Sequence, residues 1–574
     1  MMLTLIPMLA VATAFSFGDV AVDCKDPGSW TFAVTREAAE DGGEVAKIVL
    51  DAPAAAVPPR FTVRARVPQI DFTDKWSVNE GVCSMPPSWS SRGGSEVAIG
   101  MPLYVFFNNR DEAAFSIAVS ECVRHVDVAA GILEEGSFLD MVVTFFANPE
   151  APLAHYEASV RYNSRRRPFA DAVRAEVAWI ERAGGYTPCR TPEAALDPLY
   201  SSWYNFHQDV HDKDLEAECA LAAKLGMKTL IVDDGWQTDD NARGYAYCGD
   251  WQVSKRRFPD MAAHVKRVQA MGIKYMMWYS VPFVGLKSAN HAKFEGKYLV
   301  PGNFRNLGAS VLDPRFPEVR KFLVDLYVQA LKDWDIDGFK LDFIDSFYYV
   351  DTDPAVAEGY AGRDEKSVPV AVDRLMTEIK AALTAIKPDV LVEFRQCYVG
   401  PAIRKYGNML RVGDCPGNMR RNRFAIANLR LASGASAVHA DMLEWNFGED
   451  AAQSALYVIN SMFGVIQYSV MLRNAPAAHR EMLAKWIKFS QDHRETLLKG
   501  RFTPHHPELQ YPWIEAEGAD ERVVGVYSDG LVVDLPADGK KVFLMNASGR
   551  DRLTVRQGGA IRDVPVASGD WCEL

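Results

Sequence analysis

Between residues 200 and 472 the chain alternates short apolar runs with segments of helical periodicity, and this rhythm limits the fold more than any other feature of the sequence. Two intervening segments carry clear helix signals: residues 214–225 end before Gly226, and residues 317–333 begin with Pro317. Strands that are each followed by a loop and a helix close most economically into a parallel (β/α)8 TIM barrel. The predicted strands are residues 200–207, 229–236, 274–283, 338–344, 390–396, 409–414, 435–442 and 465–472.

A doubly wound open sheet would show the same alternation of strands and helices. Such a sheet carries a glycine-rich phosphate-binding turn after its first strand. The residues at that place here are Tyr204, Asn205, Phe206 and His207, none of which is glycine. The barrel is therefore the favoured arrangement.

The segments that flank the barrel have the character of β structure. Residues 17–161 contain short alternating or apolar runs, such as 103–107 and 141–146, separated by Gly, Pro, Asn and Asp clusters, which predicts a β-sandwich. A helical stretch at 169–182 leads into the barrel, and β-like runs at 523–527, 531–535 and 541–545 predict a small C-terminal β domain. We expect three domains, at residues 1–165, 166–499 and 500–574.

Composition excludes several classes of protein. The 574 residues include 63 Lys and Arg against 75 Asp and Glu, a net charge of −12, with 48% hydrophobic residues, which is typical of a folded globular chain. The acidic balance argues against a nucleic acid or an anionic membrane as partner, because phosphates require a basic face. Nine cysteines without a Cys-x-x-Cys pair form neither a zinc nor a disulfide framework.

The N-terminus leaves the cellular compartment open. Residues 3–12 are apolar and Ala12, Thr13 and Ala14 would suit signal cleavage, so residues 1–14 are a candidate signal segment. No Lys or Arg precedes the apolar run, and a hydrophobic tail or first strand fits equally well. Export and a cytoplasmic location both stay open. No other stretch reaches the roughly 18 apolar residues of a membrane span.

Polar and aromatic residues gather where the predicted strands end. In a TIM barrel the carboxyl ends of the strands form one rim, and that rim holds the active site. Carboxylates and cations there can hydrogen-bond sugar hydroxyls, while tryptophan rings cover the apolar face of a pyranose. The rim residues are Trp203, Asn205, His207, Asp233, Asp234, Trp236, Trp278, Lys340, Asp342, Asp345, Glu393, Arg395, Arg411, Asp414, His439 and Asp441.

Glycoside hydrolysis requires two carboxyl groups that face each other across the anomeric carbon, roughly 5 Å apart when one is a nucleophile. Strands four and six are one strand apart around a barrel, so Asp342 and Asp414 are plausible partners. A cation near Asp342 would keep that carboxylate ionised and nucleophilic. The carboxyl group that acts as the acid needs a pKa that burial or the charge of the other carboxylate holds up in the free enzyme.

Three motifs then make the chain similar to a known family. Asp233-Asp234-Gly235-Trp236-Gln237, Gly338-Phe339-Lys340-Leu341-Asp342 and Arg411-Val412-Gly413-Asp414 follow one another in the order and spacing of glycoside hydrolase family 36. This family contains retaining α-galactosidases and their raffinose-synthase relatives. The resemblance covers roughly residues 200–472 and extends more loosely to the flanking β domains.

The resemblance implies a double displacement that needs no metal and no organic cofactor. Asp342 would be the nucleophile and Asp414 the acid/base. Asp233 and Asp234 would bind the 4- and 6-hydroxyls of a galactose-like ring. The remaining substrate-binding residues would be Trp236, Trp278, Lys340, Arg395 and Arg411, of which Lys340 and Arg411 would also steady the two carboxylates. The expected partner is an oligosaccharide or a glycoside; the oligomeric state is open.

One departure from the family pattern leaves the substrate open. Many members have a Cys and a Gly-rich run after strand five, near the 2-position of the sugar, whereas this chain has Arg395-Gln396-Cys397-Tyr398-Val399-Gly400. It keeps the Cys and lacks the glycines. Besides an α-galactosidase, the alternatives are an α-N-acetylgalactosaminidase, an α-galactosyl transferase of the raffinose-synthase kind, and a carbohydrate-binding barrel without turnover.

Overall fold

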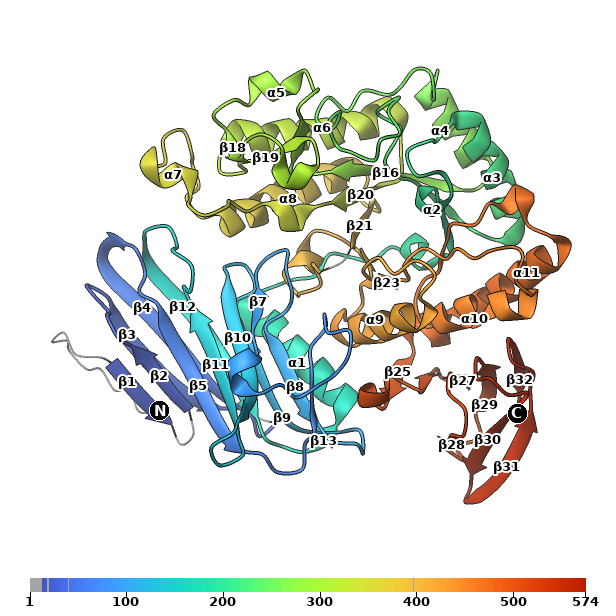
Figure 1. Cartoon of the computed structure of the whole chain (residues 1–574), viewed down its shortest axis with the longest axis horizontal. Helices are drawn as coiled ribbons and strands as arrows, with labels where there is room; N and C mark the ends of the chain where they lie inside the picture. Colours follow the sequence, from blue (N-terminus) through green and yellow to red (C-terminus); the bar gives the residue numbers. More distant parts are fainter. Residues whose placement is uncertain (1–12, 18–19, 40, 396) are drawn as a thin grey trace.

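The computed structural model describes residues 13–17, 20–39, 41–395 and 397–574. Most of the candidate signal segment, residues 1–12, lies outside the described residues, as does Gln396, the last residue of the fifth predicted strand. Within the described part the molecule has three regions: antiparallel sheets near the N-terminus, a central barrel and two smaller mixed sheets near the C-terminus (Figure 1).

The central region is the predicted TIM barrel. Eight strands form one sheet in which all seven pairings are parallel, and a bridge between His439 and Val465 joins its two ends. In barrel order the strands are β14 (Leu199–Ser201), β15 (Thr229–Val232), β16 (Lys274–Ser280), β20 (Gly338–Asp342), β21 (Leu391–Arg395), β22 (Met409–Arg411), β23 (Ala437–His439) and β24 (Gln467–Tyr468).

Helices follow the strands as the alternation predicts. Gly226 ends α3 in the left-handed conformation, with φ of 100°, and Pro317 occupies the first turn of α6. Between β21 and β22 the described residues contain only a short 3-10 helix, Ile403–Lys405. The helices are α1 (Phe169–Gly184), α2 (Trp203–Phe206), α3 (Asp212–Leu225), α4 (Met261–Ala270), α5 (Asn290–Lys293), α6 (Pro317–Trp334), α7 (Pro354–Ala357), α8 (Val368–Ile386), α9 (Met419–Ala432), α10 (Ala451–Ser461) and α11 (Ala477–Asp492).

An additional small sheet stands between β16 and α6. Its strands are β17 (Phe283–Gly285), β19 (Ala309–Leu312) and β18 (Tyr298–Val300), paired antiparallel in that order. The sequence prediction treated residues 274–283 as one strand and did not foresee this insertion. Phe283 faces Val311 across the sheet, and both are buried, so the insertion extends the core above the barrel rim.

The N-terminal region is the predicted β-sandwich. Its two sheets have the strand orders β1-β2-β5-β11-β10-β7 and β3-β4-β12-β9-β8-β6, with β13 beside β9, and buried residues such as Ile48, Leu50 and Val143 fill the space between them. The strands are β1 (Thr13–Phe17), β2 (Val20–Cys24), β3 (Thr31–Ala38), β4 (Glu44–Ala56), β5 (Phe61–Pro68), β6 (Asp74–Trp76), β7 (Gly93–Ser95), β8 (Leu103–Phe107), β9 (Glu112–Val119), β10 (Val126–Leu133), β11 (Phe138–Phe145), β12 (Leu153–Asn163) and β13 (Arg167–Pro168).

The C-terminal region contains a five-stranded sheet, β25-β26-β27-β29-β32, and a three-stranded sheet, β28-β30-β31. Val524, Leu544 and Val555 form part of the small core between them. The strands are β25 (Arg501–His505), β26 (Trp513–Glu517), β27 (Glu521–Val526), β28 (Val532–Leu535), β29 (Lys541–Asn546), β30 (Arg552–Gln557), β31 (Ala560–Pro565) and β32 (Asp570–Glu573).

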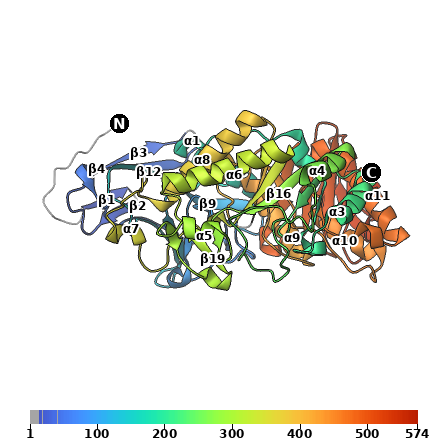
Figure 2. The same ribbon diagram turned by 90° about the horizontal axis from the view of Figure 1, so that it is seen from above.

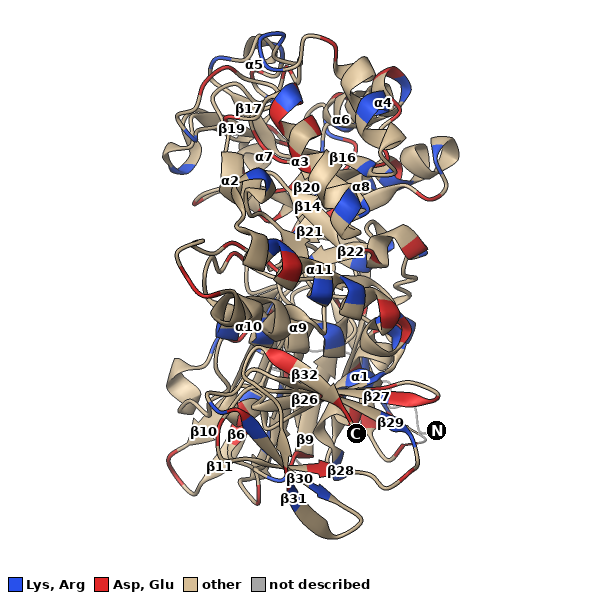
Figure 3. Ribbon diagram, turned by 90° about the vertical axis from the view of Figure 1, so that its right-hand side faces the viewer, with Lys and Arg blue, Asp and Glu red and all other residues tan. Residues whose placement is uncertain are grey.

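Three further observations concern surface charge, membrane spans and cysteines. On the side seen in Figure 3, basic and acidic residues are interspersed rather than separated into single-sign faces. Among the described residues, no helix is long and apolar enough to cross a membrane. All nine cysteines are free thiols.

Candidate active site

The carboxyl ends of the barrel strands bring the predicted site residues together. In the register of the sheet Trp278 lies opposite Lys340, Lys340 opposite Glu393, and Arg395 opposite Arg411. Paired residues of a parallel sheet point to the same face. Four neighbouring strands therefore present a tryptophan, three cations and a glutamate to one region of the barrel.

Asp342 ends β20 and is held by donors from three other segments. The indole Nε1 of Trp278 donates to its Oδ2 at 2.8 Å, and the hydroxyl of Tyr398 donates to its Oδ1 at 3.4 Å. The backbone N–H of Phe343 donates to Oδ1 at 2.7 Å, and Arg395 forms an ion pair with the same oxygen. Because Trp278 and Arg395 are themselves buried, the Asp342 carboxylate has one fixed orientation.

Asp414 lies in the loop after β22. It belongs to a group of charged residues with Arg411 and Asp441, and it is the most exposed of the three. Arg411 donates to Asp414 Oδ1 at 2.7 Å and to Asp441 Oδ1 at 2.5 Å. Asp441 is fully buried and also accepts from the hydroxyl of Tyr204 at 2.9 Å. The Asp414 side chain, in contrast, is 48% exposed, so it is the carboxylate that an incoming molecule meets.

The expectation of a raised pKa for Asp414 is not met. Burial raises the pKa of this carboxyl, but the lowering by Arg411, Arg395 and Lys340 outweighs that effect and brings the pKa to about 2. The physical reason is that the acid/base candidate shares its surroundings with three cations, one of them in direct contact. Asp414 is therefore an ionised carboxylate in the free protein.

Asp233 and Asp234 follow β15 and have different partners. Lys340 Nζ donates to Asp233 Oδ2 at 2.6 Å, so Lys340 pairs with Asp233, and the cation in contact with Asp342 is Arg395. Asp234 accepts instead from two neutral amides, Gln208 at 2.7 Å and Gln237 at 2.6 Å. Burial raises the pKa of Asp234 to about 7; the Asp233 charge adds to this rise and the two amides oppose it.

The two predicted tryptophans have different places. Trp278 donates to Asp342 and lies beside Tyr245, whose ring stacks on it with centroids 5.9 Å apart. Trp236 is completely buried, stacks on Trp251 and donates to the backbone carbonyl of Trp278 at 2.9 Å. The structure therefore does not bring the Trp236 ring to the rim; it supports the strand that carries Trp278.

Several residues that contact the predicted site were not predicted from the sequence. Gln208 and Gln237 hold Asp234, Tyr204 holds Asp441, Tyr398 holds Asp342, and Tyr245 covers Trp278. All five come from loops or a one-turn helix. Gln237 and Tyr398 stand in the segments compared with the family, but no pattern in the sequence indicates what any of the five contacts.

One group outside the barrel has the composition of a metal site. Within the described part of the chain, ligand atoms of Asp111, His506 and Glu508 lie within 4.8 Å of one another. His506 Nδ1 already contacts Glu508 at 3.0 Å, and all three side chains are partly exposed. This group joins the N-terminal region to the segment after β25 and is separate from the rim residues.

A (β/α)8 barrel whose rim gathers carboxylates and arginines is an arrangement that glycoside hydrolases use, although the fold also carries other chemistries. The sequence profile of the Melibiase family matches residues 195–500, which is more than half of the chain. The chain belongs to this family.

Individual relatives match a shorter segment. An α-galactosidase, Mel36A from Lactobacillus acidophilus, is 30% identical over 152 residues, which are 25% of this chain and 20% of that protein. The α-galactosidase AgaA from Geobacillus stearothermophilus is 27% identical over 150 residues, which are 25% of this chain and 20% of AgaA. The chain thus matches about a fifth of the length of these curated relatives.

Solved structures match the fold over nearly the whole chain. The crystal structure of AgaA from Geobacillus stearothermophilus superposes with a TM-score of 0.67 at 14% identity, covering 99% of this chain and 85% of that one. A variant of AgaA in complex with raffinose gives 0.69 at 14% identity, covering 100% and 85%. The α-galactosidase from Lactobacillus brevis gives 0.65 at 15% identity, covering 99% and 83%. These likenesses show the fold.

Proposed function

We propose that this protein is a retaining α-galactosidase in which Asp342 is the nucleophile and Asp414 the acid/base. The observation that carries the proposal is the unequal treatment of the two carboxylates. Asp342 is buried and held by four donors, whereas the Asp414 side chain is half exposed and accepts a hydrogen bond from Arg411. A nucleophile needs a fixed position, and an acid/base needs access to the leaving group and to water.

In this mechanism Asp342 attacks the anomeric carbon while Asp414 gives a proton to the oxygen of the leaving group. The covalent intermediate on Asp342 is then hydrolysed by a water from which Asp414 takes the proton. Because its pKa is about 2 in the free protein, Asp414 must gain its proton after the substrate arrives. A sugar that displaces water from the rim raises that pKa by desolvation. If it also separates Asp414 from Arg411, it removes the cation that lowers the pKa.

Asp233 and Asp234 would bind hydroxyls of the galactose ring. Both carboxyl groups are buried, and each oxygen of Asp234 already has an amide that fixes its direction. Trp278 is buried beneath Tyr245, so its part would be to orient Asp342 through the indole hydrogen bond. The AgaA variants of Geobacillus stearothermophilus solved with raffinose and with stachyose support an α-linked oligosaccharide as the substrate class.

A panel of p-nitrophenyl glycosides tests the reaction and the sugar: α-galactoside, α-N-acetylgalactosaminide, α-glucoside and β-galactoside. We expect release from the α-galactoside alone. Preference for the α-N-acetylgalactosaminide would show that the site accepts an acetamido group at the 2-position of the sugar, as in an α-N-acetylgalactosaminidase. Silence across the panel, with transfer of galactose to an acceptor sugar, would indicate a transferase instead.

The same assay tests the role of Asp342. We expect Asp342→Ala to lose nearly all turnover and azide to restore part of it with formation of a β-galactosyl azide, because the small anion fits the space that the carboxylate leaves. The matched control is Asp325→Ala, an exposed residue of α6 paired with Lys321. Normal kcat in Asp342→Ala would show that the nucleophile is another residue.

A further inference from the structure

A cavity of about 700 Å³ lies between the N-terminal sandwich and the long loop that joins β20 to α8. On one side it is lined by Glu96, Val97 and Ala98 and by residues 146 and 148–152, and on the other by residues 344–372, in part. Figures 1 and 2 both show α7, which belongs to this loop, beside the N-terminal sheets. The volume is within the range of about 300 to 1,000 Å³ of small-molecule sites.

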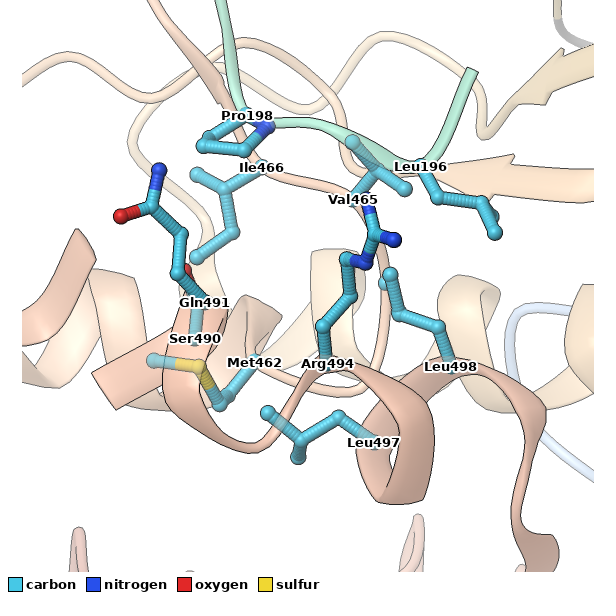
Figure 4. Close-up of a pocket in the computed structure, with 11 residues that line it drawn as sticks. Leu196, Pro198, Met462, Val465, Ile466, Ser490, Gln491, Arg494, Leu497 and Leu498 are labelled. Atoms are coloured by element: carbon cyan, nitrogen blue, oxygen red, sulfur yellow. The ribbon is translucent and has the colours of Figure 1, made fainter. Parts of the chain in front are cut away.

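This cavity differs from the void beneath the barrel. The latter is a small apolar space between Leu196 and Leu498, shown in Figure 4, and its volume of about 20 Å³ holds a water molecule and no sugar. The cavity at the sandwich is large enough for a chain of sugar rings. Neither Asp342 nor Asp414 lines it, so a molecule bound there is not in contact with the proposed catalytic residues.

Aromatic rings form much of the cavity wall. Phe146 comes from the sandwich, and Phe347, Tyr348, Tyr349 and Tyr360 come from the loop. The tyrosines are only partly buried. Burial raises the pKa of the Tyr349 and Tyr360 phenols, and the nearby charges of Asp353 and Glu150 raise it further. An aromatic ring that borders an unfilled space lacks packing partners on that side, and a sugar ring offers them.

Three carboxylates around the cavity already have basic partners. The other charged residues of the wall are Asp351, which is exposed, and Lys366, whose ammonium lies 5.6 Å from the centroid of the Tyr360 ring. Asp353 is paired with Arg315 through two contacts of 2.8 and 2.9 Å, Glu150 lies 3.6 Å from Arg124, and Glu96 lies 3.5 Å from His125. An ionic ligand would have to compete with these pairs. What the wall offers to a ligand is aromatic faces together with the amide of Asn148 and the hydroxyl of Thr352. This combination suits a neutral polyhydroxylated molecule.

The cavity shares a wall with the barrel rim. Ala98 and Ile344 line the cavity, and the thiol of Cys397 lies 4.0 Å from the Ala98 carbonyl oxygen and 3.6 Å from Asp345 Oδ2. The backbone N–H of Gly100 donates to the Cys397 carbonyl at 2.7 Å, which fixes the sandwich to this wall. A saccharide in the cavity is thus held next to the loop that leaves Asp342.

We propose that this cavity is a second saccharide-binding site, which holds a neutral oligosaccharide between the sandwich and the β20–α8 loop without cleaving it. The site does not depend on the proposed reaction. Its ligand would be recognised by the rings of Tyr349 and Tyr360 and by hydroxyl and amide groups of the wall.

Calorimetric titration of the full chain with Asp342→Asn, which prevents turnover, tests this proposal with raffinose, stachyose, maltotriose, cellotriose and mannotriose as probes. Two further variants separate the cavity from the rim. Tyr349→Ala removes a ring from the wall, and Val356→Trp fills the space from an exposed position that accepts a larger side chain, since Val356 is 63% exposed. The control is Tyr457→Ala, a half-buried tyrosine of α10.

We expect at least one probe to show a binding site that is weakened by about tenfold or more in both cavity variants and unchanged in Tyr457→Ala, since the stacking of one ring is worth about one factor of ten in affinity. Absence of such a site with all five probes overturns the proposal. So does a stoichiometry that neither cavity variant changes. If the protein proves not to be a galactosidase, both outcomes keep their meaning, because the titration measures binding sites rather than turnover.

Discussion

At the scale of single residues, the role proposed for Asp234 predicts that sugar binding depends on pH. A ligand hydroxyl donates to an ionised carboxylate, but Asp234 has a pKa of about 7 in the free protein because burial and the Asp233 charge disfavour ionisation. Below that pH the free site holds a proton that binding must release. We expect the Kd for galactose to rise by about tenfold for each unit that the pH falls below 7.

The Asp234→Asn variant checks this argument by titration at a series of pH values. Asparagine cannot ionise, so the variant should bind galactose weakly and its Kd should not depend on pH in this range. Its KM for a galactoside should rise and its kcat should fall, since hydroxyl contacts tighten in the transition state. Asp325→Asn on the surface of α6 should behave as the wild type. A wild-type Kd that stays constant as the pH falls below 7 would contradict the role given to Asp234.

At the scale of elements, the positions of all eight barrel strands follow from the sequence, but their ends do not. Residues 200–207 were predicted as one strand, whereas β14 ends at Ser201 and Trp203–Phe206 form a helix. Residues 409–414 were predicted as one strand, and β22 ends at Arg411. Apolar and aromatic residues continue past each strand because they pack above the barrel, where the chain leaves the sheet to form the site.

The motif residues of the site could be placed from the sequence because the strands that carry them were located. Asp233 lies just beyond a strand end, Arg411 at one and Lys340 two residues before one, and the topology of the barrel brings such positions to one rim. Loop residues such as Gln208 and Tyr398 could not be placed, because their contacts depend on loop conformations that no periodic pattern encodes. The pairing of Arg395 rather than Lys340 with Asp342 was missed for a similar reason, since it depends on side-chain direction.

The turn after β15 gives a prediction at this scale. Gly235 has φ of 122°, and a β-carbon there would lie 2.4 Å from the carbonyl oxygen of Gln208, which is backbone and cannot yield locally. We expect Gly235→Ala to lower the free energy of unfolding of the barrel by about 3 kcal/mol, through the strained φ and the steric clash. Denaturant titration followed by tryptophan fluorescence measures the loss.

Gly272 offers the matched control for this substitution. It also has a positive φ, of 80°, but nothing lies within 4 Å of a β-carbon added there. Gly272→Ala should therefore show only the conformational part, about 1 kcal/mol. Equal losses in the two variants would mean that the contact between the turn and Gln208 does not constrain the site.

At the scale of the whole molecule, one buried amide joins three regions. Asn428 of α9 accepts at its Oδ1 from the indole of Trp76, in the N-terminal sandwich, at 2.8 Å and from the hydroxyl of Tyr511, in the C-terminal segment, at 2.7 Å. All three side chains are fully buried. Water cannot replace Asn428 there, so both donors depend on it.

We expect Asn428→Leu to lower the free energy of unfolding by about 3 kcal/mol, because it keeps the volume of the side chain and leaves two buried donors without an acceptor. A double-mutant cycle identifies the cause. Trp76→Phe removes one of the donors, so adding it to Asn428→Leu should cost about 1 kcal/mol less than adding it to the wild type. Strict additivity in the same denaturant titrations would show that the bond between Asn428 and Trp76 does not help to hold the sandwich to the barrel. The expected coupling makes the position of the sandwich, and with it the second cavity, depend in part on this bond.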